Sequence, residues 1–368
     1  MEKITIDTPS RPSASNTAPA APSHIRVIRF DPSLAPVWES FVGDHGSASF
    51  FHGLGWKRAV ERAFGHRFHG FMAYDGDRLA GVLPMHEVRS ILAGRLLVSM
   101  PYATYGGIVA DEPSVAKALF DSAVAFCNEL GARSLELRSV HSMIADLPSR
   151  DSHATFIREL PAARDDVDQM LPRKARAAAR RAAEQHVLSC TFGEDELETM
   201  WSLYSRSMRR LSSPNYPLHF FEEIVSAHRG RIAIQIVRLD TRPIAGLLIF
   251  LHRDTVMPYF VGIDERADVY GLSQYLYSES MKWGVANGYR RYDFGRSRID
   301  NKGPFEFKRL CGFEPSVLQY QTYLAPGRSA PDLSPTSSRW SAARRVWKTL
   351  PLSVTRPLGG WLARSIPG

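Results

Sequence analysis

Four charged side chains near the end of the sequence have types and spacings that could do chemistry together. Asp293 lies on an expected strand in which its neighbours face the other way, so its carboxylate could act as a base or anchor an amine. Arg296 and Arg298 follow where that strand should end, and both suit pairing with a phosphate or a carboxylate. Lys308 stands among aromatic residues that could desolvate its ammonium and place it against a developing oxyanion or a phosphate. The structural alternatives are a loop-fixing aspartate, solvated arginines and a lysine paired with a structural carboxylate.

Other stretches could bind a ligand without reacting. Residues 172–185 form an expected helix on which Arg173, Arg176 and Arg180 share a face, which could line a track for a pyrophosphate or a tRNA acceptor stem, or be an ordinary solvated face. The glycine pair after Tyr105 permits close backbone approach to a ligand and offers N–H groups, although such pairs are mostly turns. The candidate substrate-binding residues are Tyr102, Tyr105, Gly106, Gly107, Arg176, Ser213, Arg296, Ser297 and Arg298.

Cysteine and histidine spacing gives no sign of a metal site. The three cysteines, Cys127, Cys190 and Cys311, are odd in number and form no Cys-x-x-Cys pair, so neither a disulfide framework nor a thiolate zinc site is indicated. The histidines show no repeated metal-ligand spacing. We expect no metal and a cytoplasmic protein, since there is also no secretory signal and no apolar run long enough to cross a membrane.

The elements that position these residues are expected in two copies. Residues 79–83 are echoed 165 residues later by 244–248, while Met100-Pro101-Tyr102 and Gly131 are echoed 157 residues later by Met257-Pro258-Tyr259 and Gly288. Each copy should contain a hairpin, a strand, a long helix that ends at the glycine, and a strand. In the first copy these are 68–88, 98–102, 115–130 and 134–140, and in the second 232–251, 256–262, 273–287 and 291–295. The order predicts an α+β fold.

Composition divides the chain further. Residues 8–23 are almost entirely Pro, Ser, Ala, Thr and Asn, and the segment 1–23 is expected to be disordered. Residues 24–160 and 161–325 are the expected first and second domains, and 326–368 form a basic tail that carries most of the net charge of +8. The body between is nearly neutral, so the high pI argues little for DNA or general RNA binding.

The tail has the composition of an amphipathic helix. Trp340, Ala343, Trp347 and Leu350 share one helical face and are flanked by Arg339, Arg344, Arg345 and Lys348. Such a helix, within residues 336–364, could lie on an anionic membrane surface, or both tryptophans could dock onto the protein itself. The sequence leaves both interpretations open.

The end of the second expected domain carries a family resemblance. Residues 289–298 and 305–313, with the basic stretch Pro172-Arg173-Lys174-Ala175-Arg176, resemble FemAB-type transferases, whose fold is two tandem acetyltransferase-like (GNAT-like) domains with mixed central sheets flanked by helices. The resemblance covers roughly residues 25–325. Residues 209–214 and 102–107 look closest to FemAB-related proteins that accompany exosortase (PEP-CTERM) exopolysaccharide systems in Gram-negative bacteria.

This resemblance implies transfer of an acyl or aminoacyl group to an amine on a cell-envelope or exopolysaccharide precursor, a carrier-linked sugar or peptide. It implies a catalytic role for Lys308, whose Phe-Lys element matches the family's, beside Asp293. The donor would be an acyl-CoA or an aminoacyl-tRNA, but residues 266–273 depart from the glycine spacing of acetyl-CoA users, so neither donor is predicted. The alternative is a catalytically silent member that binds a glycan precursor or a partner protein. Either would work in the cytoplasm, with peripheral contact to the inner membrane through the tail.

Overall fold

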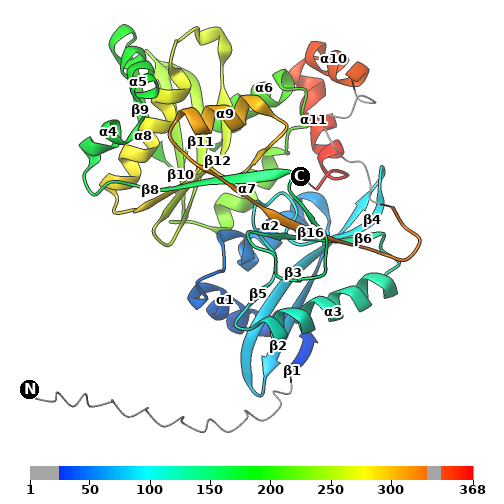
Figure 1. Cartoon of the computed structure of the whole chain (residues 1–368). Helices are drawn as coiled ribbons and strands as arrows, with labels where there is room; N and C mark the ends of the chain where they lie inside the picture. The colour runs from blue at the N-terminus through cyan, green and yellow to red at the C-terminus, as the bar shows by residue number, and fades with distance from the viewer. Residues whose placement is uncertain (1–24, 330–340, 368) are drawn as a thin grey trace, which may run out of the picture.

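The computed structural model describes residues 25–329 and 341–367, and it contains two mixed β-sheets flanked by helices (Figure 1). The first sheet has the order β1-β2-β3-β4-β6-β16-β7, with β5 beside β3. Its strands are β1 (Ile25–Arg29), β2 (Arg67–Asp75), β3 (Arg78–Ser90), β4 (Gly94–Val98), β5 (Val109–Ala110), β6 (Ser134–Ser139), β7 (Ser149–Arg150) and β16 (Gln319–Leu324). Together with α1 (Ala35–Asp44), α2 (Leu54–Phe64) and α3 (Pro113–Glu129), this sheet makes the first unit.

The second sheet has the order β14-β8-β13-β12-β11-β10-β9, with β15 beside β8. Its strands are β8 (His153–Glu159), β9 (Leu188–Gly193), β10 (Ile232–Leu239), β11 (Arg242–His252), β12 (Thr255–Ile263), β13 (Arg291–Asp293), β14 (Ser297–Arg298) and β15 (Pro315–Val317). The second unit adds α4 (Val167–Met170), α5 (Arg173–Gln185), α6 (Leu197–Arg210), α7 (Leu218–Ala227), α8 (Leu272–Ala286) and α9 (Lys302–Leu310). One strand pair in each sheet is parallel, β4 with β6 and β12 with β13. The expected α+β fold of two mixed sheets is confirmed.

The two hairpins share a bulge. In β2–β3 the pairing skips Ala80, and in β10–β11 it skips Ile244. These residues are 164 positions apart, one fewer than the 165 that separate the matching sequence stretches. Gly131 and Gly288 end α3 and α8 with φ of 65° and 83°, the left-handed conformation that glycine adopts without strain, as expected.

The repeat of Met-Pro-Tyr is not a structural repeat, and the expected strand at 98–102 is wrong. β4 ends at Val98, and the residues that follow form a turn in which Met100 and Tyr102 have φ of 50° and 64°. The second copy lies inside β12, where Pro258 stands beside a register shift that loosens the ladder. Because proline has no N–H to donate to a neighbouring strand, a Met-Pro-Tyr segment stays in a sheet only where the pairing is irregular, as it is beside Pro258.

The sheets do not divide the chain at residue 160. β8 precedes this point but pairs with β13 in the second sheet, and β16 lies far beyond it but pairs with β6 in the first. The chain first crosses between β7 and β8, and it returns to the first sheet at the buried Leu318, whose N–H donates to the carbonyl of His153 at 2.9 Å. The two units are therefore interlocked by exchanged strands.

An aromatic core fills the junction between the units. Helix α2 packs on α7, and the ring of Trp56 meets those of Phe220 and Phe250 edge-on at 5.6 and 5.8 Å. Aromatic pairs of this geometry contribute about 0.5–1.5 kcal/mol each beyond their buried area. The helices of the tail, α10 (Ser341–Thr349) and α11 (Leu352–Ala363), lie beside this junction, and the chain ends there (Figure 1).

Candidate functional site

Asp293 stands at the end of β13, where that strand lies between β8 and β12. Its side chain is buried, and one carboxylate oxygen accepts the backbone N–H of Gly295 at 2.7 Å while the other accepts the hydroxyl of Tyr105 at 2.9 Å. Burial raises the pKa of Asp293 above its usual range, and these hydrogen bonds oppose that rise. The carboxyl is thus a proton acceptor of raised basicity with fixed orientation.

Lys308 approaches the same turn from α9. Its ammonium donates to the carbonyls of Gly295 at 2.9 Å and Arg296 at 3.1 Å, and the rings of Phe156 and Phe294 lie 5.2 and 5.7 Å away. Burial lowers the pKa of Lys308 from 10.5 to about 7, while the charge of Asp293 opposes the change. Lys308 can therefore gain or lose a proton near neutral pH, as a general acid or base requires.

The first unit contributes to this centre through Tyr105. Its hydroxyl also bonds to the hydroxyl of Thr155 on β8, which in turn donates to Asp293 at 3.4 Å. Burial raises the pKa of Tyr105 well above its usual value, so the phenol remains a donor at neutral pH. Tyr105, Asp293 and Lys308, predicted from separate segments, are brought together. Thr155 was missed because only strand pairing places it there.

Arg296 forms a second layer with tyrosines that the sequence analysis did not select. Its guanidinium donates to the hydroxyl of Tyr320 at 2.9 Å, and that hydroxyl donates to the carbonyl of Thr104 at 2.5 Å. The hydroxyl of Tyr259 donates to the carbonyl of Tyr102 at 2.7 Å. These bonds fix the turn at 102–107 against the second unit.

Three predicted binding residues in that turn are already occupied. The hydroxyl of Tyr102 bonds to His66 and to the carbonyl of Ala363 in the tail. The N–H groups of Gly106 and Gly107 both donate to the carbonyl of Arg138, at 3.0 and 3.1 Å. A Cβ on Gly107 would stand 2.0 Å from the hydroxyl of Ser139. The glycines thus allow close packing on β6, and their N–H groups are bonded to the backbone of that strand.

Of the remaining candidates, Ser297 and Arg298 stand beside the centre, on the strand that pairs with β8 next to Thr155. Arg298 pairs with Asp300 through two bonds of 2.9 and 2.7 Å, and Ser297 is buried in β14. Arg176 on α5 donates to the carbonyl of Asp168 at 3.3 Å, and Ser213 follows α6. Among the described residues, no hydrogen bond or ion pair connects Arg176 or Ser213 with the Asp293 centre.

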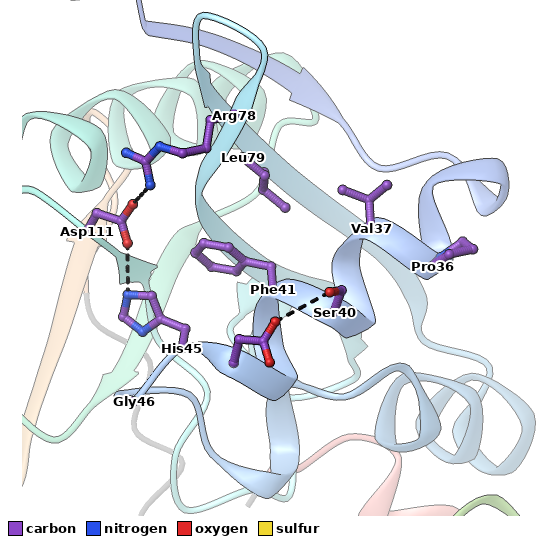
Figure 2. Close-up of a pocket in the computed structure, with 10 residues that line it drawn as sticks. Pro36, Val37, Ser40, Phe41, His45, Gly46, Arg78, Leu79 and Asp111 are labelled. Atoms are coloured by element: carbon purple, nitrogen blue, oxygen red, sulfur yellow. Dashed lines mark hydrogen bonds and ion pairs between the residues drawn. The ribbon is translucent and has the colours of Figure 1, made fainter.

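A hollow on the first unit lies apart from this chemistry (Figure 2). It is lined by apolar side chains of α1 and the β2–β3 hairpin, including Val37, Phe41 and Leu79. At its edge Asp111 pairs with Arg78 and with His45, the latter at 3.3 Å. None of the predicted site residues lines it.

Within residues 25–329 and 341–367, no group of three or more His, Cys, Asp or Glu side chains could hold a metal ion. Nor does any helix in that part of the chain have the length and apolarity needed to cross a membrane. Cys127, Cys190 and Cys311 are all unpaired.

Sequence comparison links the second unit to a family. Residues 171–309 match the family model of the acetyltransferase (GNAT) domain. This segment holds both Asp293 and Lys308, together with the turn between them. No curated protein matches the chain.

Solved structures extend the likeness to both units. The crystal structure of FemX is similar with a TM-score of 0.61 and 14% identity, covering 81% of this chain and 97% of that chain. A tandem GNAT protein from the clavulanic acid biosynthesis pathway, solved without AcCoA, has a TM-score of 0.52 and 12% identity, covering 83% and 100%. A conserved protein of unknown function from Bacteroides thetaiotaomicron VPI-5482 has a TM-score of 0.50 and 12% identity, covering 82% and 100%. The chain therefore has the tandem GNAT-like fold expected for it, and identities this low show the fold alone.

Proposed function

We propose that the protein is an acyl- or aminoacyltransferase that modifies an amine on a cell-envelope or exopolysaccharide precursor. The observation that carries this proposal is the buried centre at the junction of the units, where Asp293, Tyr105 and Lys308 surround one turn. A lysine with a pKa of about 7 beside a carboxyl of raised pKa is a typical acid–base arrangement. The GNAT match and the fold shared with FemX support transfer chemistry.

Transfer to an amine requires a neutral nucleophile, a positioned carbonyl and a donor facing the oxygen that gains charge. Asp293 would take the proton that the amine loses as its nitrogen bonds to the carbonyl carbon. Lys308 uses two of its three N–H groups on the carbonyls of Gly295 and Arg296, which leaves the third for the developing oxyanion. The bond to the donor's sulfur or oxygen then breaks, and that atom leaves with the proton that Asp293 took from the amine.

The donor in this proposal is an acyl-CoA or an aminoacyl-tRNA, and the acceptor is a carrier-linked sugar or peptide. The reaction proposed here belongs to exopolysaccharide assembly on the cytoplasmic side of the inner membrane, and the resemblance of residues 102–107 and 209–214 to proteins of exosortase systems supports it. The basic tail supports peripheral contact with that membrane.

One observation favours the second candidate, a catalytically silent module that binds a glycan precursor or partner. Asp293 is 2% exposed and Lys308 8% exposed, so the centre is closed to substrates in the described state. A transferase must therefore open the turn that carries Tyr105, whereas a binding module need not.

Two variants separate these functions. A thermal-shift screen with acyl-CoAs, charged tRNA and nucleotide sugars would first identify a donor, because a ligand that binds the native state raises the unfolding temperature. We expect Asp293→Asn and Lys308→Ala to abolish transfer from that donor without loss of donor binding. Lys302→Ala, an exposed lysine on the same helix, is the matched control and should remain active. Unchanged polysaccharide modification in cells that carry both centre variants would establish the silent module instead.

A further inference from the structure

The last helix of the tail has two contrasting faces. Thr355, Gly359 and Ala363 are buried at steps of four residues, against the region where α6 and Asn215 lie. Away from this buried face, the side chains of Val354, Leu358 and Trp361 are 41%, 37% and 56% exposed. The residues at 354, 358 and 361 form an apolar stripe at the spacing of one helical face. The tail therefore docks on the protein and still presents apolar side chains outward.

A second exposed apolar feature lies next to it. Ile91 and Leu92, in the turn between β3 and β4, are 69% and 42% exposed. Arg89 near this turn and Arg364 after α11 line one hollow of about 130 Å³, so the hairpin end and the end of α11 are neighbours. The hairpin and α11 lie on the same side of the molecule in Figure 1.

The hollow between these two features is positively charged. Arg67, Arg89 and Arg364 line it together with Glu87, whose carboxylate is already bound by Arg89 at 2.8 Å and by Arg95 at 3.2 Å. Arg67 and Arg364 form no ion pair among the described residues. The tail from 341 to 367 contains five Arg or Lys residues and no Asp or Glu. Positive charge thus lies next to exposed apolar side chains, which is the chemistry of a surface that meets anionic lipid.

We propose that this face binds an anionic bilayer. Ile91, Leu92, Leu358 and Trp361 enter the boundary between headgroups and acyl chains, and the hollow takes a lipid phosphate through Arg67 and Arg364. Trp361 and Arg364 are three residues apart and so are neighbours on the helix surface. This surface builds on the proposed placement at the inner membrane but is independent of the transfer chemistry. It differs from the face at 340, 343, 347 and 350 inferred from the sequence: Trp340 lies outside the described residues, and Trp347 is partly covered.

The test is cosedimentation of the full chain with phosphatidylcholine vesicles and with vesicles that also contain phosphatidylglycerol. We expect binding only to the anionic vesicles, weakened by salt. The double substitution Leu358→Glu and Trp361→Glu should lower binding at least tenfold, and Arg364→Ala about fivefold. Val187→Glu, at a 76% exposed apolar residue of the second unit, is the matched control and should bind like the wild type. Because the substituted side chains are exposed, all variants should keep the wild-type unfolding temperature.

Two results would overturn the proposal. One is a wild-type chain that stays in the supernatant with anionic vesicles. The other is a double variant that binds anionic vesicles as well as Val187→Glu does. If that double variant also loses a self-association that the lipid-free wild type shows, this face is an interface between copies of the chain. Vesicle binding by a protein that transfers no group would refute the transferase proposal and leave this one intact.

Discussion

Replacing Lys308 by methionine tests the acid–base centre through the pH dependence of folding. The change keeps an unbranched side chain, one heavy atom shorter, and removes the titrating ammonium that lies over the rings of Phe156 and Phe294. In the folded protein the pKa of Lys308 is about 7, whereas the unfolded chain restores the ordinary value of 10.5. Between these values the unfolded state binds more protons, so this lysine makes stability rise with pH.

The magnitude follows from that window. From pH 7 to pH 9 Lys308 of the unfolded chain stays protonated. In the folded protein, Lys308 is about half deprotonated at pH 7 and almost fully deprotonated at pH 9. Integrating this difference at about 1.4 kcal/mol per pH unit gives about 2 kcal/mol of added stability. Groups such as Cys127, whose pKa burial raises to about 11, titrate equally in both proteins and cancel in the comparison.

The assay is urea unfolding of the wild type and Lys308→Met at pH 7, 8 and 9. The free energy of unfolding of the wild type should rise relative to the variant by about 2 kcal/mol across this range. Lys302→Met, at an exposed position on the same helix, should run parallel to the wild type. Parallel curves for the wild type and Lys308→Met would show that the folded pKa is not lowered, and the acid–base argument would fail.

Three further outcomes are expected in urea unfolding at neutral pH. Tyr105→Phe should cost about 2 kcal/mol, because a buried hydrogen bond to a carboxylate is lost; in a double-mutant cycle with Asp293→Asn the costs should not add, and additivity would mean that the two do not interact. Gly271→Ala should cost more than about 2 kcal/mol, since φ is 83° and the Cβ would stand 2.1 Å from a backbone oxygen. Gly288→Ala, with the same φ but with open space around the Cβ, should cost about 1 kcal/mol. Equal costs for the two variants would refute the steric argument. Deleting residues 365–368 removes the carbonyl that accepts the N–H of Tyr102 at 2.7 Å and should cost about 1–3 kcal/mol, a prediction that an unchanged midpoint would contradict.

The sequence predicted what local patterns determine. Hairpins, long helices and the stops at Gly131 and Gly288 follow from periodicity and glycine chemistry, and all are present. The prediction of a strand at 98–102 was wrong, because a sequence pattern does not reveal that Met100 and Tyr102 adopt positive φ angles.

The site was predictable in part for the same reason. Asp293 and Lys308 stand out in the sequence by their aromatic and basic neighbours, and both lie in the centre. Thr155 and Tyr320 could not be found, because β8 and β16 bring them there only through pairing between distant segments. The close packing of the glycines at 106 and 107, which a Cβ would block, was also beyond sequence reasoning, and their binding of a ligand stays a prediction.

The exchanged strands have a consequence for biosynthesis. About 180 residues separate the end of β6 at Ser139 from the start of β16 at Gln319, its neighbour in the finished sheet. At ribosomal rates of about 5–20 residues per second, the nascent chain carries β6 with an open edge for on the order of 10–40 s. A fragment that stops at residue 160 would keep that edge for good, and it would also carry β8 with no sheet to join. The two halves are therefore expected to reach a stable native state only as one translation product.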